Sequence, residues 1–235
     1  MANDYFNFKQ FAIKQDKAAF KVGTDSVLLG ASAYIAGISR ILDVGSGTGV
    51  IALMLAQRCN AEIVAIEPDY DSFIQCMKNI DNSRWRDRIR VENTSLQDYN
   101  SDLKFDLIVT NPPYFSDSLK NPDPGKSSSR HNDSLPNDEL LQNAVRLLAE
   151  KGRLQLILPY TEGNIFIAEA SVYGLYCNSI LKIRPLPTSE IRRMILIFSH
   201  QKTRTAEKFL TIENGKRHEF TEEYINLTRE FYLKF

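Results

Sequence analysis

The sequence predicts an α/β fold, a mostly parallel β-sheet with helices on both faces. The first observation is an alternation of short β-type runs with longer segments of helical periodicity, which is typical of parallel sheets. The expected strands cover residues 41–44, 62–66, 89–92, 105–110 and 154–158. The expected helices cover residues 48–58, 69–80, 136–150 and 161–173.

The second observation is a change of rhythm after the fifth strand. Residues 179–184 and 193–199 are two further β-type runs joined by a short polar loop, which predicts an antiparallel last strand on the sheet. The sequence therefore predicts seven strands in one domain over residues 1–235, with a small N-terminal extension at about 1–30. The aromatic residues of that extension are explained most simply by a packed hairpin: Phe6, Phe8, Phe11 and Phe20.

Composition restricts the class of protein. The 235 residues carry no formal net charge, so any binding to nucleic acid has to come from a local basic patch. Cys59, Cys76 and Cys177 are far apart and fit a reduced, cytoplasmic protein. No signal peptide is expected in the first ten residues, and no apolar run is long enough to span a membrane. No metal site and no stable protein partner are indicated.

The sequence Asn111-Pro112-Pro113-Tyr114 follows the apolar run of residues 105–110 directly. It is therefore expected at the carboxyl end of a buried strand, the edge where open α/β sheets bind ligands. Two prolines make the turn rigid and fix the direction of the backbone carbonyls. An amide, a fixed carbonyl and an aromatic ring suit a planar group that carries an amine.

A glycine-rich turn joins the first expected strand to its helix. Asp43-Val44-Gly45-Ser46-Gly47-Thr48-Gly49 lets the backbone approach a ligand, and the amides of the helix start favour electronegative atoms. Because Val50 stands where a dinucleotide fingerprint has its third glycine, the turn fits an Asp-x-Gly-x-Gly-x-Gly pattern better. The Asp43 carboxylate suits a ligand with an ammonium or sulfonium group.

Two acidic residues follow the next two strands. Glu67, at the end of the second strand, is placed to accept both ribose hydroxyls of an adenosine. The alternative for Glu67 is an acid favoured by the start of a helix, a position for which Asp69 is better placed. Asp98, after the third strand, is similarly placed to accept from an adenine amine, although acids in loops are common.

These motifs, in this order and spacing, resemble the class I S-adenosylmethionine-dependent methyltransferases that act on amino nitrogens. The stretches 8–11, 21–25, 28–30, 129–131 and 231–233 further resemble the bacterial tRNA adenine-N6 methyltransferases that modify the adenine 3′ of the anticodon in valine tRNA. The resemblance covers nearly the whole chain. Phe20 and Ser129 depart from the family, which usually has methionine and alanine there.

The resemblance implies a Rossmann-like fold, S-adenosylmethionine as cofactor and tRNA as substrate. The expected catalytic residues are Asn111, Pro112 and Tyr114. The expected cofactor contacts are Lys21, Gly23, Thr24, Asp43, Gly45, Gly47, Gly49, Glu67, Asp98 and Asn111. The expected substrate contacts are Pro113, Tyr114, Phe115, Lys126, Arg130, His131, Arg192 and Arg193. The long loop at 116–134 starts at this site, so a substrate-binding or lid role is expected.

Other functions remain open at this point. The same fold and cofactor could serve a guanine N2 of ribosomal RNA or a protein glutamine amide, because the Asn-Pro-Pro-Tyr motif suits those acceptors too. A non-catalytic RNA-binding module is an alternative of another class. A nicotinamide-dependent oxidoreductase is disfavoured by Val50 and by the absence of a proton-relay pattern.

Overall fold

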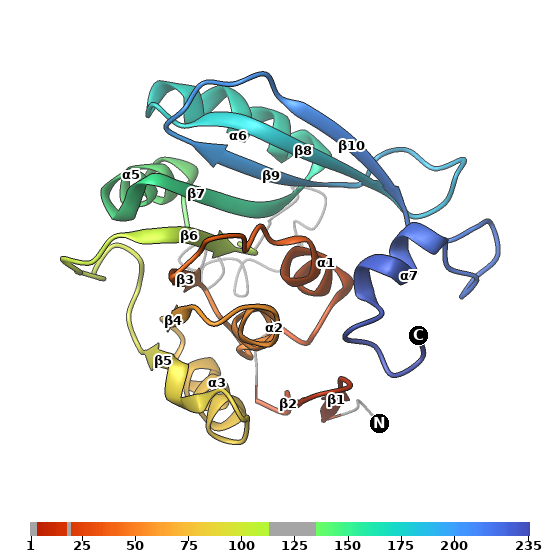
Figure 1. Ribbon diagram of the computed structural model, residues 1–235, viewed down its shortest axis with the longest axis horizontal. Coiled ribbons are helices and arrows are strands. Elements are labelled where there is room, and N and C mark those ends of the chain that lie inside the picture. The colour runs from red at the N-terminus through yellow and green to blue at the C-terminus, as the bar shows by residue number, and fades with distance from the viewer. Residues whose placement is uncertain (1–3, 18–19, 113–134) are drawn as a thin grey trace, which may run out of the picture.

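The computed structural model describes residues 4–17, 20–112 and 135–235 of the chain. A central sheet of eight strands has the order β10-β8-β9-β7-β6-β3-β4-β5, and a separate two-stranded sheet pairs β1 with β2 (Figure 1). The strands are β1 Tyr5–Asn7, β2 Ala12–Lys14, β3 Arg40–Val44, β4 Glu62–Ile66, β5 Ile89–Glu92, β6 Phe105–Thr110, β7 Leu148–Pro159, β8 Tyr176–Arg184, β9 Arg193–Ser199 and β10 Ala206–Thr211.

The helices are α1 Thr24–Ser32, α2 Val50–Arg58, α3 Tyr70–Asp81, α5 Asn137–Leu147, α6 Tyr160–Val172 and α7 Glu222–Thr228, with a short 3-10 turn η1 at Arg86–Arg88. Helices α5 and α6 lie on one side of the sheet, and α1, α2 and α7 lie on the other (Figure 1). Neighbouring strand residues point to opposite faces, as Ile41 and Leu42 do in β3, and so feed two separate cores.

All strands of the central sheet but one run in a common direction. Strands β5, β4, β3, β6 and β7 are parallel neighbours, and β9 runs antiparallel between β7 and β8. The predicted antiparallel strand is therefore β9. Because β9 runs in the opposite direction, Arg193 at its start pairs with Pro159 at the end of β7. The start of β9 thus lies at the same edge as the carboxyl ends of the parallel strands.

The structure differs from the sequence prediction at the ends of the fold. The prediction of seven strands misses β10, an eighth strand that pairs in parallel with β8. Residues Ala206–Phe209 are exposed in this edge strand, so its sequence lacks a continuous apolar run. The predicted helix 136–150 is also too long, because α5 ends at Leu147 and Leu148 already pairs with Phe105 in β6.

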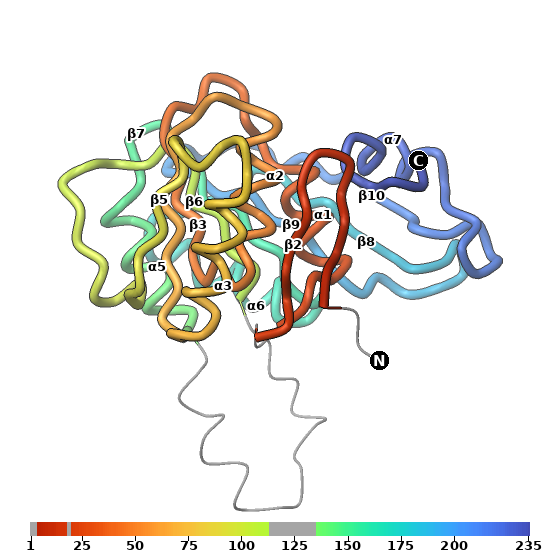
Figure 2. Tube along the Cα trace, turned by 90° about the horizontal axis from the view of Figure 1, so that it is seen from below, coloured from red at the N-terminus to blue at the C-terminus, as the bar shows by residue number. Residues whose placement is uncertain are grey.

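The N-terminal hairpin of β1 and β2 lies against α3 and the chain's C-terminal end (Figure 2). Phe8 stacks on Phe11 at 4.6 Å between ring centroids and forms a β-bridge with Tyr232. The packed hairpin predicted from the aromatic residues is confirmed for Phe6, Phe8 and Phe11, whereas Phe20 is 71% exposed and takes no part in it. The division into one domain with an extension at about 1–30 stays a prediction.

Candidate active site

The glycine-rich turn connects β3 to α2 at the carboxyl edge of the sheet. Gly45, Gly47 and Gly49 all have positive φ, at 68°, 53° and 80°, which side-chain-bearing residues rarely adopt. The amides of Gly45 and Ser46 donate to the Ile66 carbonyl at 2.9 and 3.0 Å. These bonds fix the turn against the end of β4, so its conformation is set by neighbouring backbone.

The three glycines face different surroundings. A Cβ on Gly45 or Gly47 would meet no described heavy atom within 4 Å, so both turn positions face open space. A Cβ on Gly49 would lie 2.9 Å from the Cys76 sulfur, because α2 starts close against α3. Burial raises the pKa of the Cys76 thiol to about 12, so this cysteine is a packing residue. The space beside Gly45 and Gly47 can therefore take a ligand, whereas the missing side chain of Gly49 allows α3 to pack closely against the start of α2.

Asp43 lies at the base of this turn with no exposed surface. The Ala52 amide donates to its Oδ2 at 3.1 Å, whereas Oδ1 accepts no hydrogen bond from any described residue. Burial raises the pKa of the Asp43 carboxyl to about 7; the Ala52 amide lowers it and the charge of Glu67 raises it. A buried acceptor atom without a donor costs free energy, so Oδ1 is suited to a donor from a ligand.

Glu67 follows β4 and is 7% exposed. The Gly47 amide donates to Oε2 at 2.8 Å, and the Asp69 amide donates to Oε1 at 3.0 Å. Burial raises the pKa of Glu67, and the two amide bonds lower it. Each carboxylate oxygen has two acceptor positions, so Glu67 can still receive hydroxyl groups. Asp69, and not Glu67, caps α3, because its Oδ2 accepts from the Ser72 amide at 2.8 Å.

Asp98 is the cofactor candidate with the least support from its surroundings. It is exposed, and its Oδ2 accepts from the Ser95 hydroxyl at 2.7 Å within a local turn. The residue that joins this region to Glu67 is Asn93, whose Nδ2 donates to the backbone oxygens of Glu67 and Pro68 at 2.8 and 3.0 Å. The sequence prediction missed Asn93, although its place directly after β5 could have indicated it.

Asn111 and Pro112 leave the end of β6 beside the glycine turn. Strand β6 is the neighbour of β3, with Thr110 in register with Val44. The Thr110 hydroxyl is buried and donates to the Val44 carbonyl at 3.0 Å, which ties the two strand ends together. Asn111 and Gly45 directly follow this pair of residues, so both begin at the same edge of the sheet. The predicted residues Pro113, Tyr114, Phe115, Lys126, Arg130 and His131, with loop 116–134, lie outside the described residues.

The predicted N-terminal contacts lie at the start of α1. Lys21, Gly23 and Thr24 are exposed, and Gly23 caps the helix with an ordinary extended φ of −124°. Asp25, in the first turn, accepts from the Arg193 guanidinium at 2.8 Å. This ion pair joins α1 to the start of β9.

The two predicted arginine contacts differ in their surroundings. Arg193 pairs with Asp25, so its charge is partly neutralised, and it also holds the start of α1. Arg192 is exposed, and its side chain makes no ion pair with another described residue. The Arg192 carbonyl accepts from the Tyr160 amide at 3.2 Å, which places an exposed tyrosine, 41% accessible, beside it at the end of β7. Tyr160 was not predicted as a site residue.

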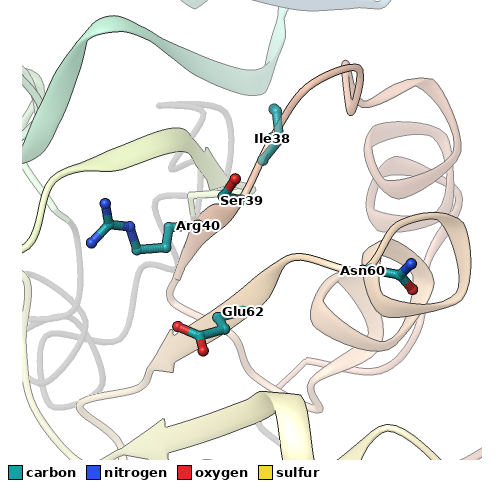
Figure 3. A pocket seen from close by; sticks show the side chains of 5 residues that line it. All are labelled: Ile38, Ser39, Arg40, Asn60 and Glu62. Atoms are coloured by element: carbon teal, nitrogen blue, oxygen red, sulfur yellow. The ribbon is translucent and has the colours of Figure 1, made fainter.

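A surface hollow of about 490 Å³ lies at the opposite edge of the sheet. It is lined by Ile38, Ser39, Arg40, Asn60 and Glu62, around the first residues of β3 and β4 (Figure 3). The candidate residues gather at the far ends of these strands, so this hollow is separate from them. Among the described residues, no helix is long and apolar enough to span a membrane, and no three His, Cys, Asp or Glu side chains form a metal-binding group.

Comparison with known proteins gives a family for the chain. A family model for the methyltransferase small domain matches residues 23–163. A tRNA1(Val) (adenine(37)-N6)-methyltransferase of Trichodesmium erythraeum is 42% identical, with 100% of both chains covered. A relative with the same description from Phocaeicola vulgatus is 46% identical, with 99% of both chains covered.

Solved structures of methyltransferases share the fold. A predicted O-methyltransferase from Agrobacterium tumefaciens superposes with a TM-score of 0.64 at 20% identity, covering 88% of this chain and 96% of that one. A ribosomal protein L11 methylase from Lactobacillus delbrueckii subsp. bulgaricus gives 0.58 at 17% identity, covering 81% and 84%.

The strand order, the antiparallel β9 and the glycine turn define the class as a Rossmann-like methyltransferase. The family expected from the sequence is confirmed. The chain belongs to the family of tRNA1(Val) (adenine(37)-N6)-methyltransferases, over its full length.

Proposed function

We propose that this protein transfers a methyl group from S-adenosylmethionine to N6 of the adenine 3′ of the anticodon in valine tRNA. The observation that carries the reaction is the position of Asn111 and Pro112 at the end of β6, next to the glycine turn of β3. The choice of tRNA rests on the full-length relatives. The substrate implies that the protein works in the cytoplasm.

The residues at the ends of β3 and β4 fit S-adenosylmethionine. When bound, this cofactor supplies an electrophilic methyl group on a sulfonium. Asp43 offers the unpartnered buried Oδ1 to a cationic or hydrogen-bond-donating group of the ligand. Glu67 is fixed by two backbone amides and offers its remaining lone pairs to ribose hydroxyls. Gly45 and Gly47 leave open space above the turn.

Asn111 and Pro112 prepare the acceptor. The amino nitrogen of adenine is a poor nucleophile because its lone pair is delocalised into the ring. The Asn111 side-chain oxygen and the Pro112 carbonyl accept from the two amine hydrogens and favour a pyramidal nitrogen. The rigid proline turn holds both acceptors in place before the substrate arrives. A strong base and a metal ion are not part of this proposal, because a sulfonium is already an activated leaving group.

The adenine has to leave the stacked anticodon loop to reach these acceptors. Contacts to the RNA backbone must then hold the loop at the carboxyl edge of the sheet. Among the described residues Arg192 is suited to this, since it is exposed and forms no ion pair with another described side chain. Tyr114, Phe115 and the basic residues of loop 116–134 remain proposed substrate contacts.

The test is transfer of labelled methyl to unmodified bulk tRNA, followed by nuclease digestion and separation of the nucleosides. We expect label in N6-methyladenosine, recovered from valine tRNA. Label in guanine would contradict the proposed acceptor while leaving the methyltransferase reaction in place, and so would label found only when ribosomal RNA or protein replaces tRNA in the same assay. Cofactor binding without transfer to any RNA or protein would support a non-catalytic module.

A further inference from the structure

Helix α3 carries two amide side chains on its buried side. Gln75 and Asn79 are 3% and 4% exposed and lie one helical turn apart, next to the packing residues Cys76 and Ile80. Buried amides in a helix interior require hydrogen-bond partners, and neither finds them within its own helix. Their partners show which segments α3 holds.

Asn79 binds two segments that are far apart in the sequence. Its Oδ1 accepts from the Lys14 amide, and its Nδ2 donates to the Lys14 carbonyl, each at 2.9 Å. The same Nδ2 donates to the Thr48 carbonyl at 2.9 Å. One side chain therefore fixes both backbone groups of Lys14, at the end of β2, and one carbonyl of the glycine turn.

The Thr48 carbonyl lies between two positions that the candidate cofactor site uses. Gly47, before it, donates to Glu67, and Gly49, after it, starts α2. Thr48 is 3% exposed, so water cannot readily replace the amide of Asn79 at this carbonyl. A shift of Thr48 would move the Gly47 amide and with it the carboxylate of Glu67.

The segment that follows Lys14 connects to the start of α1 through further hydrogen bonds. Gln75 Oε1 accepts from the Lys17 amide at 3.3 Å, and Gln15 Oε1 accepts from the Val22 amide at 3.0 Å. Val22 immediately precedes Gly23, the cap of α1. Asn79 thus sits where the N-terminal segment and the glycine turn meet.

We propose that Asn79 is a positioning residue for the cofactor site, holding the glycine turn and the end of β2 in one fixed relation. The proposal rests on the proposed cofactor site and is independent of which base is methylated. Loss of Asn79 should weaken cofactor binding, with little change in kcat at saturating cofactor, because Asn79 does not border Asn111 or Pro112 in any described contact.

The test compares Asn79→Ala, Asn79→Asp and a control, Asn82→Ala. Asn82 caps the end of the same helix, and its Nδ2 donates to the Lys78 carbonyl and to no other described residue. Asn79→Asp keeps an acceptor for the Lys14 amide but cannot donate to Thr48. Binding of S-adenosylhomocysteine is measured by calorimetry, together with melting temperature, KM for each substrate, and kcat.

We expect both Asn79 variants to raise the Kd for S-adenosylhomocysteine by about tenfold, because a glycine turn that Asn79 no longer holds has to be ordered when the ligand binds. A tenfold change corresponds to about 1.4 kcal/mol, which is comparable to one buried hydrogen bond. KM for tRNA, kcat and the Asn82→Ala values should stay close to those of the unchanged protein. A lower melting temperature with unchanged Kd would overturn the proposal and leave Asn79 a purely structural residue. Failure of methyl transfer to tRNA in the unchanged protein would overturn the proposed substrate only.

A measurement on the unchanged protein keeps the proposal testable if the variants do not fold. Hydrogen exchange of the Lys14 amide, which donates to Asn79, should become slower when S-adenosylhomocysteine binds. The amide of Tyr99, which donates to the Ser95 carbonyl in a loop without contact to Asn79, serves as reference. Exchange at Lys14 that does not respond to the ligand would contradict the coupling.

Discussion

Asp43 and Glu67, at the ends of β3 and β4, are buried carboxylates bound by backbone amides and by no cationic side chain of the described residues. Lys182, on β8, is a partly exposed cation that pairs with Glu207 at 2.6 Å. At these positions the two halves of the sheet hold acidic groups in opposite ways. The ends of β3 and β4, in what we call the cofactor half, hold buried carboxyl groups without a cationic partner among the described residues, whereas the Lys182–Glu207 pair lies at the surface.

This difference distinguishes the proposed binding site from an ordinary charged surface. A surface ion pair adds little free energy and needs no further partner. A buried carboxylate is costly unless something compensates it, and backbone amides compensate Asp43 only at Oδ2. The ends of β3 and β4 thus leave one buried acceptor atom, Asp43 Oδ1, open to a donor, which is what the proposed cofactor site requires. The burial of these acidic groups, and not the number of charged residues, is what indicates a ligand-binding site here.

The largest expected effect lies between the two halves, at Asn111. Asn111→Ala should lower kcat for methyl transfer by about 100-fold, because one pre-organised acceptor for the amine is lost. Cofactor affinity should stay within a few fold. Single-turnover rates and calorimetry on the same preparation check both values. Equal losses of rate and cofactor affinity would mean that Asn111 binds the cofactor and does not act on the acceptor amine.

A smaller effect is expected from pH on the cofactor half. The raised pKa of Asp43, about 7, means that the folded protein without ligand holds a proton there below pH 7. Between pH 3.8 and about 7 the unfolded chain has lost the Asp43 proton while the ligand-free folded protein keeps it, so the fold loses stability as pH rises through that range. A cationic ligand needs the ionised form, so its affinity should fall by about tenfold per pH unit below pH 7.

Calorimetry with S-adenosylhomocysteine from pH 5.5 to 8.5 measures this dependence for the ligand's ammonium group, because this ligand has lost the sulfonium charge and keeps the ammonium. Asp43→Asn is the matched control, since it keeps the side-chain shape and cannot ionise. Any pH dependence of affinity that remains in this variant does not come from Asp43. A slope that is the same in Asp43→Asn and in the unchanged protein would show that Asp43 does not face the cation.

The smallest effect is expected from Arg192, at the start of β9. Arg192→Ala should weaken tRNA binding a few fold and reduce the slope of log K against log salt by about 1, as expected for one lost phosphate contact. Arg40→Ala is the control, because Arg40 lines the hollow at the opposite edge of the sheet. An equal effect of both variants would mean that tRNA binding depends on the total charge of the protein and not on contacts at the carboxyl edge of the sheet.

The central strands and the class of site could be predicted from sequence because their signals are local. The apolar runs of β3, β4 and β6 end in Asp43, Glu67 and Asn111, or close to them, and parallel strands bring those ends to one edge. The glycines at 45, 47 and 49 predicted a turn that in the structure has positive φ at all three positions.

Other features depend on tertiary contacts that the sequence does not express locally. Strand β10 is exposed along most of its length and pairs with the edge of β8, a tertiary contact that its own sequence does not indicate. Asn79 binds Lys14, 65 positions away, so only its polar type on a buried helix face could have indicated it. The Arg193 pair with Asp25 joins residues 168 positions apart, which is why Arg193 was expected to be as open to RNA as Arg192.

The central claim is that β3 and β4 hold the cofactor while β6 holds the acceptor amine. The most direct measurement is calorimetric binding of S-adenosylhomocysteine to Glu67→Ala and Asn111→Ala, with methyl-transfer rates at saturating cofactor. We predict that Glu67→Ala mainly weakens binding and that Asn111→Ala mainly lowers the rate. Unchanged affinity in Glu67→Ala, or a loss of affinity in Asn111→Ala as large as its loss of rate, would contradict the account.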